Sequence, residues 1–187
     1  MFLIEDDYGI SKKCQEIIDN EILSNQFPWY WQDSSTSYKY PFFSHIIIPR
    51  YDLETEELKI NSPLFTFFDD IRKSFCDIHN ISFTRYLRAS LNLSLYFNSE
   101  HSEPHIDHPF PHKSIIMYLN DFTNGSTIIF DKQFDGTTST ITDNAPIILQ
   151  KIEGKKGKIT CFDGSYYHAT AWPAAGQRRI ICVMTFE

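Results

Sequence analysis

The sequence has few cysteines, and those present form no motif. Its four cysteines, Cys14, Cys76, Cys161 and Cys182, lie far apart and include no Cys-x-x-Cys pair. Zinc fingers and dithiol redox sites are built from such closely spaced pairs. We therefore expect reduced cysteines packed in the protein interior.

Long hydrophobic runs are also missing. No stretch approaches the roughly 18 consecutive apolar residues that a membrane-spanning helix needs, so no membrane span is expected. Residues 1–7 lack both the basic region and the apolar stretch of a secretory signal peptide. Together these absences predict a soluble cytoplasmic protein.

Positive charge is scarce. The chain has 17 Lys and Arg against 24 Asp and Glu, a formal net charge of −7. General nucleic-acid-binding proteins need clustered Lys and Arg to contact phosphates, so this balance argues against that class. Aromatic residues make up 16% and charged residues 22% of the chain, a mix typical of folded globular domains. At 187 residues the chain fits one domain with one core.

The two halves of the chain have different patterns. The first half predicts two helices, one capped by Ser11 and running to about residue 24, and one that follows Pro63 and runs to about residue 80. After residue 80, short strands separated by turns are typical of an antiparallel sandwich or jelly roll. The expected fold is therefore α+β and mainly β, with a helical support region at 1–80 and a β core at 81–187.

Strands are expected at residues 2–4, 42–48, 88–97, 113–120, 126–130, 146–152, 158–162 and 178–186. Residues 113–120 and 126–130 are expected to pair across the short link at 121–125. In 88–97 the side chains alternate, with polar residues on one face and apolar residues on the other. The apolar face can pack on the two helices, which leaves the polar face, beginning with Arg88, to line a pocket.

The segment around His105 contains a candidate metal site. His105 and Asp107 stand two positions apart, so in an extended segment both side chains project from the same face. We expect them on the strand after 88–97. His168, in a stretch that favours strand, turn and strand, could supply a third ligand. Two imidazoles and one carboxylate are the ligand set of non-haem Fe(II) oxygenases, although each residue alone is more simply explained as an ordinary surface or hydrogen-bonded side chain.

An arginine follows at a suitable distance. Arg178 stands ten residues after His168, beyond a turn rich in Pro and Gly, and its guanidinium could bind a carboxylate in bidentate fashion. In the last strand Arg178 shares a face with Ile180, whereas Arg179 shares a face with Ile181. Only one of the two arginines can therefore point into the pocket, and the spacing from His168 favours Arg178.

Taken together, these motifs resemble the iron- and 2-oxoglutarate-dependent oxygenases, particularly the prolyl-4-hydroxylase-like branch and its small relatives encoded by bacteriophages. The resemblance covers nearly the whole chain. It rests on Phe27–Tyr30, Phe43–His45, Glu103–Asp107, Met117–Asn120, Gly125–Thr127, Phe162–His168 and Arg178. Two departures are modest: Asn124 precedes Gly125 where the family usually has two glycines, and Arg178 stands where many prolyl hydroxylases have lysine.

The resemblance implies a fold and a reaction. The fold would be a double-stranded β-helix, or jelly roll, with the N-terminal helices packed on one sheet. Fe(II), held by His105, Asp107 and His168, would act with 2-oxoglutarate and dioxygen to hydroxylate a C–H bond, with succinate and carbon dioxide as co-products and ascorbate as an optional reductant.

The resemblance also assigns the co-substrate site. Arg178 would bind the distal carboxylate of 2-oxoglutarate, with Tyr96, Tyr118 and Thr127 as hydrogen-bonding neighbours. The two tyrosines are equally well explained as ordinary aromatic residues of a sheet.

Several alternatives remain open at the level of sequence. The first substrate expected is a peptide or protein residue such as proline, and residues 27–39 and 131–144 are expected to cover the site and select it. A free amino acid, another protein side chain or a nucleotide is also compatible, and the ligand set accepts zinc or manganese. The non-enzyme alternative is a jelly-roll protein that binds metal for structure or sensing. Arg178 disfavours it, because a structural site has no use for a carboxylate clamp.

Overall fold

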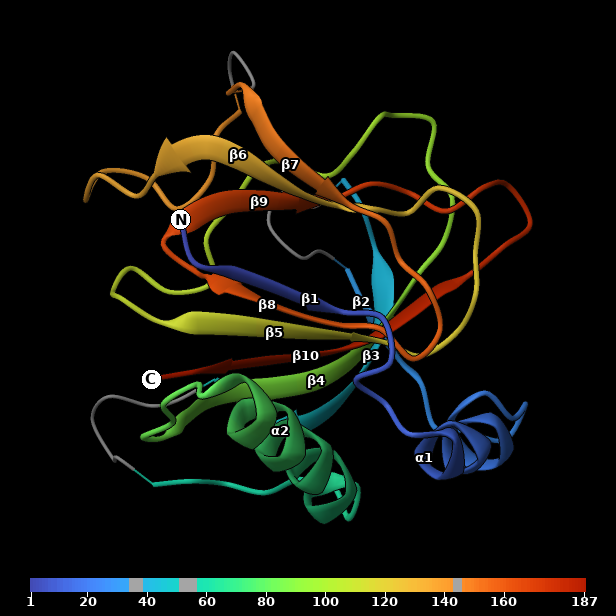
Figure 1. Cartoon of the computed structure of the whole chain (residues 1–187). Helices are drawn as coiled ribbons and strands as arrows, with labels where there is room; N and C mark the ends of the chain where they lie inside the picture. Colours follow the sequence, from blue (N-terminus) through green and yellow to red (C-terminus); the bar gives the residue numbers. More distant parts are fainter. Residues whose placement is uncertain (34–38, 51–56, 143–145) are drawn as a thin grey trace.

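Two facing β-sheets and two helical segments make up the structure, a computed structural model that describes residues 1–33, 39–50, 57–142 and 146–187. The layers run from the helices, through a seven-stranded sheet, to a three-stranded sheet (Figure 1). None of the helices in these ranges has the length and apolar character needed to cross a membrane.

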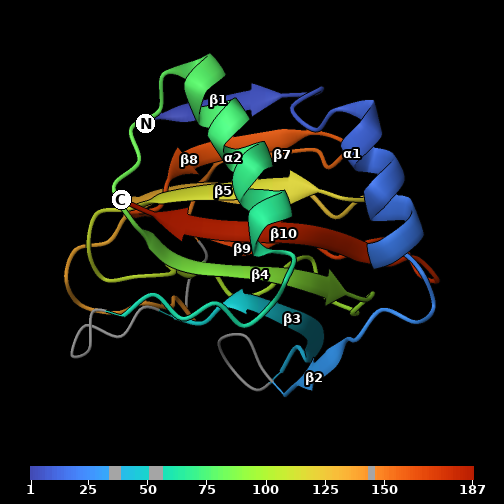
Figure 2. The ribbon, with the colours of Figure 1, turned by 90° about the horizontal axis from the view of Figure 1, so that it is seen from below.

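The two predicted helices are present. The first comprises α1 (Lys12–Ile17) and a π-helical continuation, η1 (Ile18–Ile22); the Oγ of Ser11 accepts a hydrogen bond from the backbone N–H of Cys14 at 3.3 Å. The second is α2 (Phe65–His79). It ends at Asn80, whose left-handed backbone (φ 54°) is a common way to terminate a helix. Both helical segments lie against the same face of the larger sheet (Figure 2).

The seven-stranded sheet is antiparallel throughout. In spatial order its strands are β1 (Leu3–Asp6), β8 (Ile159–Asp163), β5 (Lys113–Tyr118), β10 (Arg179–Phe186), β4 (Tyr86–Ser94), β3 (Phe42–Ile48) and β2 (Tyr30–Gln32). The first strand of the chain therefore lies at one edge, and the last strand lies near the middle.

The smaller sheet consists of β7 (Ile148–Ile152), β6 (Thr127–Gln133) and β9 (Tyr166–Thr170), in that order. The expected pairing of residues 113–120 with 126–130 is wrong, because β5 and β6 belong to different sheets. The link between them crosses from one sheet to the other, helped by positive φ angles at Asn124 (63°) and Gly125 (71°). A short polar link looks the same in sequence whether it turns back as a hairpin or crosses between two sheets.

The metal motif also departs from expectation. His105 and Asp107 lie in the irregular segment between β4 and β5 and not on a strand. His105 forms isolated bridges to His168 and Thr140. The alternation of a continuous strand therefore does not position this pair. Instead, the backbone of His105 pairs with His168 of β9, and this pairing positions His105.

Apolar side chains fill the two interfaces between the layers. Alternate residues of β10, beginning with Ile180 and Cys182, pack with the helices, while Ile181 and Val183 face the smaller sheet. Cys76, Cys161 and Cys182 are buried and all four cysteines are unpaired, as expected from their spacing.

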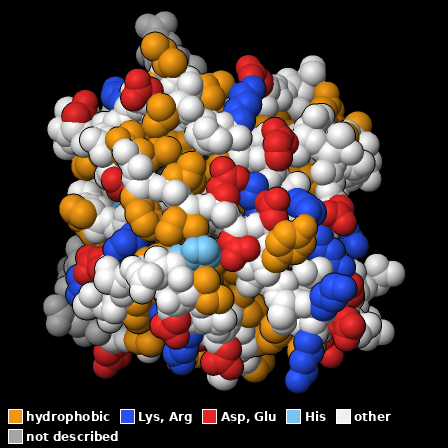
Figure 3. All heavy atoms as spheres, viewed as in Figure 1, with side chains coloured by type: hydrophobic (Ala, Val, Ile, Leu, Met, Phe, Trp, Pro, Cys, Tyr) orange, Lys and Arg blue, Asp and Glu red, His pale blue; other side chains and the backbone are white. Residues whose placement is uncertain are grey.

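Charge is distributed over the surface. Acidic and basic side chains are mixed across the face drawn in Figure 3. Lys158, for example, pairs with Glu5 at 2.5 Å, and Lys156 pairs with Asp19 at 2.6 Å. The acidic partners therefore offset the positive charge of both lysines.

Candidate functional site

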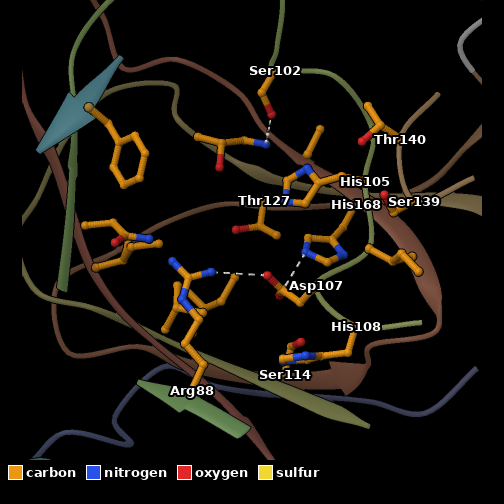
Figure 4. Close-up of a pocket in the computed structure, with 18 of the residues that line it drawn as sticks. Arg88, Ser102, His105, Asp107, His108, Ser114, Thr127, Ser139, Thr140 and His168 are labelled. Carbon is orange, nitrogen blue, oxygen red and sulfur yellow. Dashed lines mark hydrogen bonds and ion pairs between the residues drawn. The ribbon is translucent and has the colours of Figure 1, made fainter. Parts of the chain in front are cut away.

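Three possible metal ligands meet between the sheets. His105, Asp107 and His168 each offer one ligand atom, and these atoms lie within 4.8 Å of one another. The Nε2 atom of His168 is 3.5 Å from Oδ2 of Asp107, and the ring centroids of His105 and His168 are 4.7 Å apart. Figure 4 shows the three side chains converging. The structure therefore brings together the trio that the sequence singled out.

The backbone holds the two imidazoles in a defined orientation. His105 and His168 exchange a pair of backbone hydrogen bonds of 2.9 Å each. The Nδ1 atom of His105 lies 3.0 Å from the carbonyl oxygen of Glu103, and that of His168 lies 3.1 Å from the carbonyl oxygen of Tyr166. A carbonyl oxygen can only accept, so each Nδ1 donates its proton. With one proton on each ring, Nε2 keeps the lone pair that a metal needs.

The electrostatics favour the forms that bind metal. Burial, reinforced by the neighbouring His168, lowers the pKa of His105 to about 4, so its imidazole is neutral at pH 7. Burial opposes ionisation of Asp107, but its contact with His168 and the charge of Arg88 hold the pKa of this carboxyl well below its usual value. Neutral imidazole and ionised carboxylate are the states that coordinate a cation.

A large cavity adjoins these three residues. Its volume is about 930 Å³, and it is lined by residues of both sheets and of the loops around them. Within the described ranges, no fourth His, Cys, Asp or Glu joins the group. Structural metal sites are normally closed by four protein ligands, whereas catalytic sites keep positions open. Two imidazoles and one carboxylate beside a cavity fit Fe(II) with open positions.

Arg179, and not Arg178, lies in the cavity. Arg178 is exposed, and its Nη2 donates to the carbonyl oxygen of Leu23 at 3.4 Å. Arg179 is only 1% exposed; its Nε donates to the carbonyl oxygen of Gly125 at 2.8 Å, and its Nη2 donates to Oγ1 of Thr127 at 3.0 Å. The prediction that Arg178 points into the pocket is therefore wrong by one residue.

Strand pairing explains this error. Arg179 is directly opposite Ser94, on the polar face of β4 that was expected to line the pocket, and residues directly opposite one another in an antiparallel pair share a face. Ile180 and the alternate residues after it pack on the helices. Arg178 precedes the strand, so its spacing from His168 says nothing about the direction of its side chain.

Of the three expected neighbours of the arginine, the structure brings Tyr118 and Thr127, but not Tyr96, close to Arg179. Tyr118 is buried, and its hydroxyl lies 2.7 Å from Oγ1 of Thr127. The guanidinium carbon of Arg179 is 5.7 Å from the centroid of the Tyr118 ring. Tyr96 is different: it is 49% exposed, contacts Asn98 and does not line the cavity. The structure therefore does not bring Tyr96 to the pocket face, because β4 ends at Ser94 and the alternation stops there.

Arg179 also lacks an acidic partner. Over the described ranges, no carboxylate lies within ion-pair distance of its guanidinium. Burial accordingly lowers the pKa of this group from its usual value, and only the nearby Tyr118 opposes the effect. A buried cation with free donors beside a cavity is suited to binding an anionic ligand.

Two cavity arginines were not predicted as site residues. The Nη1 atom of Arg88, on β4, is 3.5 Å from Oδ1 of Asp107, and Nη1 of Arg50 donates to the Asp107 carbonyl oxygen at 2.6 Å. Alternation did place Arg88 on the pocket face. Nothing in the sequence links Arg50 to the metal motif, because their contact spans 57 residues.

The two predicted covering loops contribute to the cavity in part. Gln32 comes from the 27–39 segment, and residues 134, 136, 137, 139 and 140 come from the 131–144 segment. Residues 34–38 and 143–144 of these segments lie outside the described residues, and the other described residues of both segments do not line the cavity.

Comparisons with known proteins bear on the fold. The sequence matches no protein-family model and no curated protein. An oxidoreductase of the 2OG-Fe(II) oxygenase family from Burkholderia pseudomallei has a similar structure, with a TM-score of 0.67 at 15% identity over 98% of this chain and 84% of that one.

Two further structures are similar. A prolyl hydroxylase from Trichoplax adhaerens, in complex with a hypoxia inducible factor peptide fragment, has a TM-score of 0.59 at 13% identity over 98% of this chain and 83% of that one. HygX from Streptomyces hygroscopicus, with nickel, 2-oxoglutarate and hygromycin B bound, has a TM-score of 0.59 at 11% identity over 98% of this chain and 82% of that one. These similarities confirm the predicted jelly-roll fold.

Proposed function

We propose that the protein is an Fe(II)- and 2-oxoglutarate-dependent oxygenase that hydroxylates a C–H bond. One observation carries the proposal: Arg179, buried and without an acidic partner among the described residues, lines the same cavity as the His105, Asp107 and His168 cluster. A metal-binding protein without catalytic function would need the cluster but not the arginine. The structures of similar fold, including one with 2-oxoglutarate bound, support the same activity.

Each residue has a proposed task. His105, Asp107 and His168 would hold the iron, and Arg179 would bind the distal carboxylate of 2-oxoglutarate. Thr127, fixed by the hydroxyl of Tyr118, presents its Oγ1 beside that carboxylate site. Bound Fe(II), with 2-oxoglutarate and dioxygen, supplies the oxidising chemistry, and succinate and carbon dioxide leave as co-products.

Part of the cavity wall is apolar. Ile116, Ile181 and Val183 line the cavity from the larger sheet, and Phe162 joins them from β8. Such side chains exclude water, which strengthens every electrostatic contact to a bound anion. In this proposal the protein supplies the ligands, the orientation and a partly apolar wall.

We propose a residue of a peptide, such as proline, as the first substrate to test. The prolyl hydroxylase of similar fold binds a peptide fragment, and a cavity of about 930 Å³ is large enough for a group beyond 2-oxoglutarate. A small-molecule substrate is the second candidate, since HygX was solved with hygromycin B.

Succinate release tests the proposal. The protein is incubated with Fe(II), 2-oxoglutarate and air, with and without mixtures of peptides and metabolites, and the products are searched by mass spectrometry for the addition of one oxygen atom. We expect substrate-dependent succinate release in the wild type and none in Asp107→Ala. Equal succinate release by both proteins would contradict the assignment of the metal site, and oxygen addition to metabolites alone would contradict the peptide substrate.

A further inference from the structure

A second group of polar residues lines the cavity beside the metal ligands. Arg88 on β4, His108 in the loop and Ser114 on β5 surround Asp107 on the side of the larger sheet (Figure 4). Arg88 and Ser114 are both directly opposite Thr185 of β10. Arg88, Thr185 and Ser114 therefore form a row across three adjacent strands. We call Arg88, His108 and Ser114 the Arg88 subsite.

The Arg88 guanidinium is poorly satisfied within the protein. Its contacts are 3.5 Å to Oδ1 of Asp107 and 3.3 Å to Oγ of Ser90, at or beyond the long end of the hydrogen-bond range. Over the described residues it has no other hydrogen bond. A guanidinium offers five donors, so most of them remain available to a ligand.

A second atom of the subsite lacks a partner. The Oγ atom of Ser114 is buried and has no hydrogen-bond partner in the described ranges, although the residue lines the cavity. Buried hydroxyls normally find a partner, and those that do not call for an unplaced ligand or water. Nearby, Nε2 of His108 contacts Oγ1 of Thr185 at 2.8 Å, which fixes the imidazole beside the subsite.

The charge of the cavity also favours an anionic ligand. Its described lining contains three arginines, Arg50, Arg88 and Arg179, and one carboxylate, Asp107. The charge of Fe(II) and that of a 2-oxoglutarate dianion would cancel, so two positive charges remain unbalanced in a chain whose net charge is −7. Arg179 makes its contacts with Gly125 and Thr127 and shares none with Arg88, so a co-substrate carboxylate bound to Arg179 would leave the remaining donors of Arg88 available.

We propose that the Arg88 subsite binds an oxyanion of the substrate, either a carboxylate or a phosphate, and thereby holds the substrate beside the metal ligands. This inference rests on the proposed function and narrows its substrate class to acidic molecules. Arg88 would donate two N–H groups to the oxyanion in bidentate fashion, and the Ser114 hydroxyl would donate a third hydrogen bond.

Binding to an inert form of the protein tests this inference. The wild type is first loaded, without oxygen, with Mn(II) and saturating 2-oxoglutarate, so that Arg179 is occupied. Inorganic phosphate, acetyl-Asp-amide and the neutral acetyl-Asn-amide are then titrated by calorimetry. We expect one of the two anions to bind and acetyl-Asn-amide not to bind; the anion that binds identifies phosphate or carboxylate as the natural group.

Three variants separate the subsite from other roles. Arg88→Gln should weaken binding of the anion at least about tenfold. Ser114→Ala should weaken it less, because Ser114 contributes one hydrogen bond whereas Arg88 contributes two hydrogen bonds and a positive charge. Arg178→Gln removes an exposed arginine outside the cavity and should leave the affinity unchanged.

The outcomes are distinguishable. Failure of the wild type to bind Mn(II) with 2-oxoglutarate would contradict the proposed function itself. With that binding intact, absence of anion binding, or equal binding by wild type and Arg88→Gln, would overturn the subsite. An equal loss of 2-oxoglutarate affinity in Arg88→Gln would also overturn it, by showing that Arg88 serves the co-substrate or holds Asp107.

Discussion

Arg179 and Thr127 meet between the two sheets, with 3.0 Å from Nη2 of the arginine to Oγ1 of the threonine. Arg179 begins β10 in the larger sheet, and Thr127 begins β6 in the smaller one. Tyr118 completes the group through the 2.7 Å contact of its hydroxyl with Thr127. This cluster joins the sheets at the position that we assign to the distal carboxylate of 2-oxoglutarate.

Replacing Arg179 should weaken the use of 2-oxoglutarate. Loss of one partner from a buried charge pair typically costs about 2–5 kcal/mol, so Arg179→Ala should raise the apparent Michaelis constant for 2-oxoglutarate roughly thirtyfold or more. The fold should persist, because no described carboxylate is left unpaired by the change. Arg178→Ala is the matched control and should have little effect. A large effect confined to Arg178→Ala would show that the exposed arginine performs the task.

Removing the Tyr118 hydroxyl should have a smaller effect of the same kind. In Tyr118→Phe the ring stays in the core, while Oγ1 of Thr127 loses one of its two hydrogen-bond partners and keeps Arg179. A neutral hydrogen bond contributes about 1 kcal/mol, so the dissociation constant for 2-oxoglutarate should rise about fivefold. Tyr96→Phe provides the control, because Tyr96 is half-exposed and its hydroxyl contacts Asn98 and not Thr127. Equal effects in the two variants would remove Tyr118 from the site.

The metal ligands should be separable from the fold. His168→Ala should lose stoichiometric metal binding and all succinate release, yet keep the circular dichroism spectrum of the sheets, because β9 remains paired with β6. His101→Ala removes a histidine that lies between β4 and β5 and does not belong to the ligand group, and this variant should bind metal normally. Metal content by elemental analysis reports the difference. Normal metal content in His168→Ala would refute this ligand set.

A buried ion pair on the other side of the sheet predicts how stability depends on pH. Asp69 accepts hydrogen bonds from Nη2 of Arg72 at 2.5 Å and from the hydroxyl of Tyr86. Burial alone would raise the pKa of Asp69, but its hydrogen bonds with Lys73, Tyr86 and Arg72 lower it below the usual value. The stability that this carboxylate contributes is therefore present above the unfolded-state pKa of about 3.9 and is lost as the pH falls through the folded-state pKa.

Asp69→Asn tests that relationship. It should lower the free energy of unfolding at pH 7 by about 2 kcal/mol, because hydrogen bonds to charged groups are lost. The difference from the wild type should shrink as the pH falls below about 4. Urea unfolding at several pH values measures it, and Asp70→Asn, an exposed neighbour on α2, should show neither effect. A difference that is constant with pH would rule out the charge of Asp69 as its origin.

Sequence reasoning predicted the features that local patterns determine. The spacing of apolar residues identified α2, and the alternation in 88–97 assigned Arg88 to the pocket face, where the structure has it. His105 and Asp107 were singled out by their two-residue spacing, and His168 as the third member of the ligand set typical of non-haem Fe(II) oxygenases. Their convergence depends on backbone pairing between distant segments, which sequence could suggest but not define.

The errors share a physical cause. Whether Arg178 or Arg179 faces the cavity depends on where β10 begins and on its pairing with Ser94 of β4, and a shift of one residue reverses the faces of a strand. Tyr96 was misplaced because β4 ends two residues earlier. Arg50 was missed because only the folded chain brings it to Asp107. Each error concerns a relation between segments that no local pattern encodes.

Anaerobic titration with Fe(II) and 2-oxoglutarate tests the central claim most directly. The chelate of Fe(II) with the 2-oxo acid has a weak visible charge-transfer band, so addition of both to the wild type should produce this band with one iron per chain. Asp107→Ala should give no band, and Arg179→Ala should need a much higher concentration of 2-oxoglutarate to produce it. Absence of the band in the wild type at saturating Fe(II) and 2-oxoglutarate would contradict the oxygenase assignment and favour a jelly-roll protein that binds metal without this chemistry.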